Sequence, residues 1–86
     1  MYQLEQWLSH RWQSDTRYYT ADIIQDLFGI WIFRCGWGGL ANRNGNHQEK
    51  TLANYDEGLV LLKETNKRRQ GRGYRLVSRH QQYPAF

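Results

Sequence analysis

The pattern of hydrophobic positions between residues 30 and 37 is the clearest structural signal in the chain. The odd positions are all apolar, whereas the even positions include Ile30, Ile32 and Arg34. This alternation places the two sets on opposite faces of a β-strand. Residues 17–24, rich in Tyr, Thr and Ile, precede it across a turn signal at Asp26–Gly29, where Asp bonds nearby backbone and Gly accepts a positive φ. We predict two antiparallel strands, over residues 17–24 and 30–36.

A second hairpin is predicted from the segments 40–42 and 47–52. They flank Arg43–Asn46, and the Asn-Gly pair inside that tetrapeptide is a strong signal for a tight β-turn. Four antiparallel strands in a meander follow from these segments. Residues 74–78 are compatible with a further short edge strand.

A helix is predicted to begin after Asn54. Asn is a good N-cap, and Glu57 stands at the third helical position, as in a capping box. One stripe carries Tyr55, Leu59, Leu62 and Asn66, with Val60 and Leu61 beside it. The helix should run to about Gln70 and end at Gly71 or Gly73. The predicted fold class is therefore α+β, with an antiparallel sheet of about four strands and one long helix packed on one face.

The first 15 residues leave two interpretations open. The spacing of Leu4, Trp7, Leu8 and Trp12 fits one face of a short helix, and it fits equally well an irregular arm that packs its tryptophans on the domain. We divide the 86 residues into an N-terminal arm (1–15), one domain (16–79) and a C-terminal tail (80–86) that contains Pro84 and Phe86.

Composition argues against several function classes. Cys35 is the single cysteine, which excludes an internal disulfide framework and suits a reducing cytosol. There is no apolar run of about 18 residues, so we expect a cytoplasmic protein without a membrane segment. The three histidines are too scattered for metal-ligand spacing, and no phosphate-binding loop or nucleophile motif is present. We predict a non-catalytic protein that has neither a metal nor a cofactor, with Cys35 as a buried, inert thiol.

The net charge of +4 is concentrated near one end of the predicted helix. Residues 63–80 contain seven Lys or Arg side chains and a single anion, Glu64. Cations in a last helical turn are stabilised by the helix dipole and need no partner. Six cations between Lys67 and Arg79 exceed that purpose, so an anion-binding patch is slightly favoured. We predict phosphate contacts from Lys67, Arg68, Arg69, Arg72 and Arg75. Arg34, Arg43 and Lys50 would extend this patch if the tip of the second hairpin lies near the C-terminal end of the helix.

Residues 25–39 also resemble a known family signature. Gln25–Trp31, then Arg34, then Trp37-Gly38-Gly39 are similar to the WGR domain of poly(ADP-ribose) polymerases and of many small bacterial proteins. The similarity extends from about Arg17 to Tyr74. It implies an α+β fold and, as in DNA-binding members, a signature Trp that packs on nucleic acid near a strand end. One position departs from the signature, since Gly39 stands in place of its Arg.

Trp37 has two interpretations. It either continues the apolar face of its strand, or a glycine-induced bulge turns its indole outward to stack on a base or sugar. The WGR resemblance favours the second. Our functional prediction is a nucleic-acid-binding module, with DNA favoured, that reads backbone or ends and neutralises four or five phosphates, giving a log–log salt slope of about −4. The alternative is a protein-interaction domain or homodimer, joined through a sheet edge or anchored by Trp7, Trp12 and Tyr83.

Overall fold

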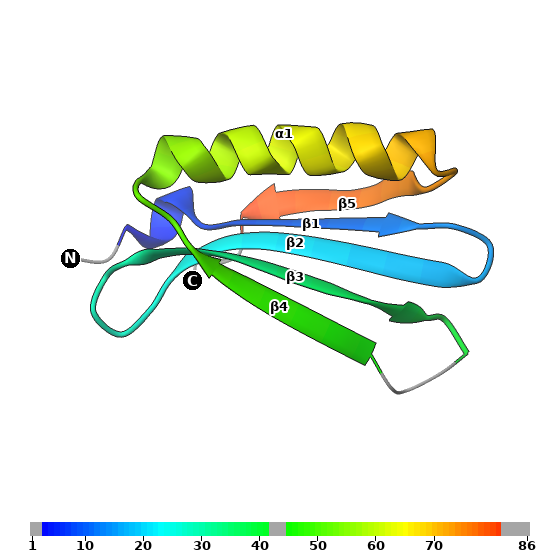
Figure 1. The fold of residues 1–86 in the computed structure, drawn as a ribbon, viewed down its shortest axis with the longest axis horizontal. Helices are drawn as coiled ribbons and strands as arrows, with labels where there is room; N and C mark the ends of the chain where they lie inside the picture. The colour runs from blue at the N-terminus through cyan, green and yellow to red at the C-terminus, as the bar shows by residue number, and fades with distance from the viewer. Residues whose placement is uncertain (1–2, 42–44, 82–86) are drawn as a thin grey trace.

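A computed structural model of the chain describes residues 3–41 and 45–81, the last two by their backbone alone. Within these residues, five antiparallel strands form one sheet, and a single α-helix packs on one of its faces (Figure 1). The elements are η1, a 3-10 helix (Leu4–Gln6), β1 (Leu8–Gln13), β2 (Arg17–Gln25), β3 (Trp31–Gly39), β4 (Gly45–Thr51), α1 (Tyr55–Gly71) and β5 (Arg75–Gln81). The predicted α+β class is confirmed.

The sheet has five strands where about four were predicted, and their order is β4-β3-β2-β1-β5. Strands β1 to β4 follow one another as hairpins, and α1 then carries the chain back so that β5 pairs with β1. Two observed strands lie outside the predicted four. One is β1, from the N-terminal segment, for which a short helix and an irregular arm were both wrong over residues 8–13; the other is β5, which corresponds to the further edge strand considered for residues 74–78. Pairing on both edges makes β1 a strand, and its burial alternates, with His10 and Trp12 buried and their neighbours less so.

The β3–β4 hairpin also differs from its prediction. Strand β3 continues to Gly39, Leu40 and Ala41 lie in a turn, and β4 begins at Gly45, so residues 40–42 do not form a strand as far as they are described. The glycines do not end β3 because β2 side chains fill the space beside them. A Cβ atom on Gly36 would lie 2.9 Å from Thr20 Oγ1, and one on Gly38 would lie 2.9 Å from the Tyr18 ring.

Helix α1 begins as predicted. The Asn54 side chain accepts a hydrogen bond from Glu57 N at 2.9 Å, and Glu57 Oε1 accepts one from Ala53 N at 2.7 Å. The helix buries Gly58, Leu62 and Thr65 against the sheet, whereas Leu59 and Val60 are exposed. Of the predicted stripe, Leu62 is buried, whereas Leu59 is exposed and the preceding residue, Gly58, is buried instead. The long α1 is needed to cover this face of the sheet.

The hydrophobic core lies between α1 and the middle strands. Its buried members are Trp12, Ala21, Ile23, Phe33, Leu52 and Leu62. Among the described residues, no helix combines the length and the apolar character needed to cross a bilayer.

Candidate functional site

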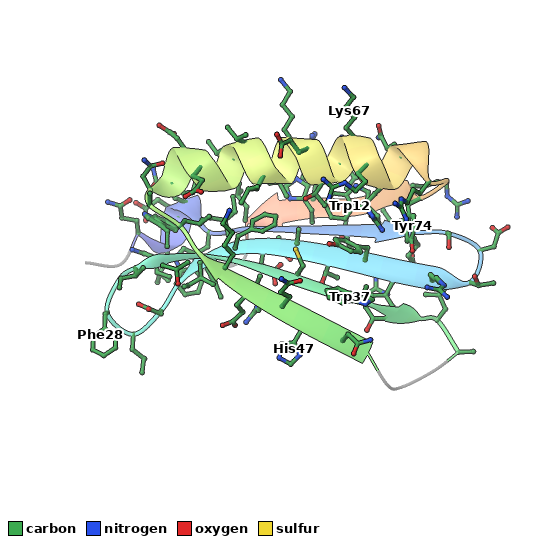
Figure 2. All side chains as sticks on the ribbon, in the orientation of Figure 1. Trp12, Phe28, Trp37, His47, Lys67 and Tyr74 are labelled. Atoms are coloured by element: carbon green, nitrogen blue, oxygen red, sulfur yellow. The ribbon has the colours of Figure 1, made fainter. Side chains whose placement is uncertain are left out.

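A concavity lies on the helix side of the sheet, beside the C-terminal end of α1. It has a volume of about 480 Å³. Three side chains are arginines and three are aromatic, so we call it the arginine–aromatic groove; its lining is Ser14, Arg17, Tyr19, Trp37, Gly38, Gln48, Arg69, Arg72 and Tyr74. Figure 2 shows Trp37 and Tyr74 at the same end of the molecule, contributed by β3 and by the segment that follows α1.

The end of α1 places Arg69 against Tyr74. Tyr74 N donates to Arg69 O at 2.9 Å, Gly73 N donates to Gln70 O at 3.1 Å, and Gly73 has a φ of 87°. This pair of hydrogen bonds around a left-handed glycine is the Schellman motif. In this motif the side chains at the positions of Arg69 and Tyr74 meet. Of the two glycines considered for the helix end, Gly73 takes the left-handed position.

Arg69 is held by aromatic rings. Its guanidinium carbon lies 4.3 Å from the ring centroid of Tyr19 and 5.2 Å from that of Tyr74. Both distances are within the range of a cation–π interaction. Arg69 Nε is buried and has no hydrogen-bond partner among the described residues. The guanidinium is therefore oriented by stacking, and no ion pair within the described part of the chain neutralises it.

Trp37 continues the helix-side face of β3. The β2–β3 register runs without a shift from Gln25↔Trp31 to Arg17↔Gly39, so the bulge considered for this tryptophan is absent from the described strand. Its indole stacks on Tyr19, with ring centroids 6.0 Å apart and an interplanar angle of 14°. Trp37 is nevertheless only half-buried, and it lines the groove. Trp37 lies on the core face of β3, as the first interpretation predicted. Helix α1 leaves part of its indole uncovered, so the side chain is still accessible from the groove.

Tyr19 and Gln48 line both the groove and a neighbouring cavity of about 190 Å³, which Cys35 also lines. Burial raises the pKa of Tyr19 to about 12, and a hydrogen bond to Cys35 contributes to the rise. Burial likewise raises the pKa of the Cys35 thiol. A thiol whose pKa is raised is mostly protonated at neutral pH and is a poor nucleophile.

The structure brings three of the predicted site residues together: Trp37, Arg69 and Arg72. Arg68 lines the neighbouring cavity. Lys67 is exposed and points away from the sheet on the outer side of α1 (Figure 2). Arg43 lies outside the described residues.

Two predicted site residues lie on the opposite face of the sheet. Arg34 donates to Asp22 Oδ2 from Nη2 at 3.0 Å and from Nε at 3.3 Å, so its charge is paired within the protein. Arg75 pairs in register with Gln13, whose neighbour Trp12 faces the helix, which places Arg75 on the other face. The sheet therefore separates Arg34 and Arg75 from the groove.

Sequence reasoning missed Arg17, Tyr19 and Tyr74 as site residues. Tyr19 pairs in register with Trp37, so predicting the β2–β3 pairing residue by residue would have identified it. Tyr74 follows Gly73, and the Schellman signature at the helix end is the signal that would have placed it on Arg69.

The aromatic residues considered as protein-interaction anchors are placed differently from that expectation. Trp12 is fully buried, and its Nε1 donates to Asn66 Oδ1 at 2.9 Å, so it is a core residue. Trp7 is half-buried and donates to Gln25 Oε1 at 3.2 Å. Tyr83 lies outside the described residues.

The described residues contain no cluster of three or more His, Cys, Asp or Glu side chains that could hold a metal ion. Comparisons of the chain with models of protein families, with curated proteins and with solved structures gave no match. The geometry of the groove is thus the observation from which a function has to be argued.

Proposed function

We propose that this chain is a non-catalytic nucleic-acid-binding module and that the arginine–aromatic groove is its binding surface. The observation that carries the proposal is the position of Arg69, stacked between Tyr19 and Tyr74 beside a half-buried Trp37. Arginine forks bind phosphate oxygens, and flat rings stack on bases or sugars. A single concavity offers both kinds of group.

The expected mode of binding is independent of sequence. A helix that reads bases has to enter the major groove, whereas α1 packs its buried stripe on the sheet. Phosphate contacts from Arg17, Arg69 and Arg72 position a strand without reading it. DNA is the favoured ligand because residues 25–39 resemble the WGR domain, some members of which bind DNA. Gly39, which replaces the signature Arg, leaves these contacts to other arginines.

The binding test is a fluorescence titration of the protein with a short 5′-phosphorylated duplex, its single strand and the matching RNA, each at several salt concentrations. Stacking on Trp37 should quench tryptophan emission. Three arginines that neutralise three phosphates predict a log–log salt slope of about −3 on a duplex and about −2 on a single strand. This is shallower than the slope expected from the sequence, because Arg34 and Arg75 lie on the other face.

A matched pair of variants separates the groove from the general positive charge. Arg72→Gln removes one cation from the groove lining, and Lys67→Gln removes one cation from the outer side of α1. Arg72→Gln should weaken binding several-fold for every sequence tested and flatten the salt slope by about one, while Lys67→Gln changes both little. Equal losses from the two variants, or no salt-dependent binding by the wild type, would contradict the proposal.

A further inference from the structure

The turn between β2 and β3 exposes two large hydrophobic side chains at the end of the sheet remote from the groove. Leu27 is 89% exposed and Phe28 is 85% exposed. Figure 2 shows Phe28 pointing away from the sheet at the tip of this turn. Adjacent exposed side chains of this size are a signature of an interaction surface. We refer to Leu27 and Phe28 as the hydrophobic tip.

Hydrogen bonds fix the shape of this turn. Asp26 Oδ1 accepts from Phe28 N at 2.9 Å and from Ile30 N at 3.0 Å, and Gln25 Nε2 donates to Gly29 O at 2.8 Å. Gly29 takes the positive φ, 81°, that the turn requires. The two apolar side chains are therefore held out from the molecule by a rigid backbone, so that docking them costs little additional ordering.

An apolar depression of about 370 Å³ lies beside the tip. Leu4, Trp7, Gln25, Asp26 and Leu27 line it. Leu27 thus belongs both to the projection and to the wall of the depression. A projection and a cavity that are adjacent on one surface form a self-complementary patch, which is the requirement for a two-fold interface between identical chains.

We propose that a second copy of this chain covers the hydrophobic tip, forming a two-fold dimer in which Phe28 of each copy enters the depression of the other. The distribution of charge favours this occupant. Arg17 begins β2 and Asp26 follows its other end, so the cations of the groove lie about 30 Å from the turn, the length of a nine-residue strand. The cations of the groove therefore do not oppose contact at the tip, and both grooves stay open at the outer ends of the dimer.

A lipid surface is the other environment that accepts an exposed Leu-Phe pair. Peripheral membrane binding usually combines apolar side chains with nearby cations that face anionic headgroups. Here the residue beside the tip is Asp26, and the cations of the groove are at the far end of the strand. The observations therefore favour a protein surface over a bilayer.

The test is sedimentation velocity of the full chain over a wide range of concentrations, with circular dichroism of each variant. The wild type should pass from monomer to dimer with a dissociation constant on the order of 10 µM, as expected for a small interface. Phe28→Ser should raise that constant at least tenfold with an unchanged spectrum, because the ring is exposed in the monomer. Val60→Ser is the matched control: Val60 is 56% exposed on α1, away from the tip, and its replacement should leave dimerisation unchanged.

Three results would overturn the proposal. They are a wild type that stays monomeric across the range, equal dimerisation by Phe28→Ser and wild type, and cosedimentation with neutral phosphatidylcholine vesicles that Phe28→Ser abolishes. The proposal does not rest on nucleic-acid binding, and the two are distinguished by salt. Dimerisation through an apolar patch should persist at salt concentrations that release nucleic acid, and Phe28→Ser should still bind nucleic acid as a monomer.

Discussion

Trp12 and Trp37 lie on one cross-strand row of the same sheet face, separated only by Tyr19, yet their surroundings differ completely. Trp12 lies beneath α1, fully buried and bonded to Asn66. Trp37 lies beside the helix, half-buried in the arginine–aromatic groove. The same alternation in sequence thus yields a core residue in one strand and a groove-lining residue two strands away. Helix α1 covers Trp12 and leaves Trp37 partly uncovered, and this difference in cover decides the environment of each tryptophan.

The sheet-facing stripe of α1 differs in the same way along its length. It begins with Gly58, passes through Leu62 and Thr65, and reaches Arg69 one turn later. At Gly58 the helix packs so close that a Cβ atom would lie 2.9 Å from Leu52 Cδ1. At Arg69 a long cationic side chain lies between the helix and Tyr19. The residue sizes on one stripe therefore distinguish the closed core from the open groove.

The largest effect that tests this contrast is on stability. Trp12→Ala should lower the free energy of unfolding by about 3–5 kcal/mol, since it removes a fully buried ring, whereas Trp37→Ala should cost only about 1 kcal/mol. Urea denaturation followed by circular dichroism measures both losses. If the two losses were equal, Trp37 would be a core residue and the distinction between the covered and uncovered parts of the row would be lost.

Glycine substitutions in α1 test the close approach of the covered part. Alanine at Gly58 would meet Leu52 and Ile23, so Gly58→Ala should destabilise the fold by about 1 kcal/mol, because overpacking outweighs alanine's better helix propensity. Gly71 is the matched control, since nothing lies within 4 Å of a Cβ atom there. Gly71→Ala should be neutral or stabilise by up to about 0.5 kcal/mol. Thermal unfolding of the pair decides the matter, and a stabilising Gly58→Ala would show that the helix is not in close contact.

Replacing Arg69 by an uncharged side chain should give the groove the apolar character of the region beneath α1. Arg69→Met keeps an unbranched side chain of similar length and removes the cation, so stability should change by less than about 1 kcal/mol. Nucleic-acid affinity should fall about tenfold, or about 1.4 kcal/mol. The fluorescence titration described for the wild type measures this loss. Unchanged affinity would mean that Arg69 only organises the rings of Tyr19 and Tyr74.

Much of the fold could be predicted because its signals are local. The alternation in residues 30–37, the turn at Asp26–Gly29 and the cap at Asn54 each act within a few residues, and the structure contains the corresponding elements. Strand β1 was missed because its identity depends on pairing with β2 and β5, which lie elsewhere in the sequence. The pattern of its own residues does not distinguish it from a helix.

The site was only partly predictable for a related reason. The cluster of cations near the end of α1 is visible in the sequence, but the face that each cation takes is not. Helical position separates Lys67 from Arg69, and strand register places Arg75 beside Gln13 on the far face. One of the two interpretations of Trp37 had a glycine-induced bulge turn its indole outward, whereas Gly36 and Gly38 accommodate Thr20 and Tyr18 on the other side of β3.

The smallest predicted effect concerns Tyr19, which lies at the boundary between the two tryptophans. Burial raises its pKa to about 12 in the folded protein, with a contribution from the hydrogen bond to Cys35, against about 10 in an unfolded chain. Between these two values the folded state binds more protons than the unfolded state, so stability falls as the pH rises. The contribution of Tyr19 is fully present below about pH 10 and is lost as the pH approaches 12.

Tyr19→Phe has no hydroxyl to ionise, so its stability should decline less over this interval. Urea denaturation of both proteins across the interval gives the difference, and a difference independent of pH would show that the Tyr19 hydroxyl is as well solvated as an exposed tyrosine.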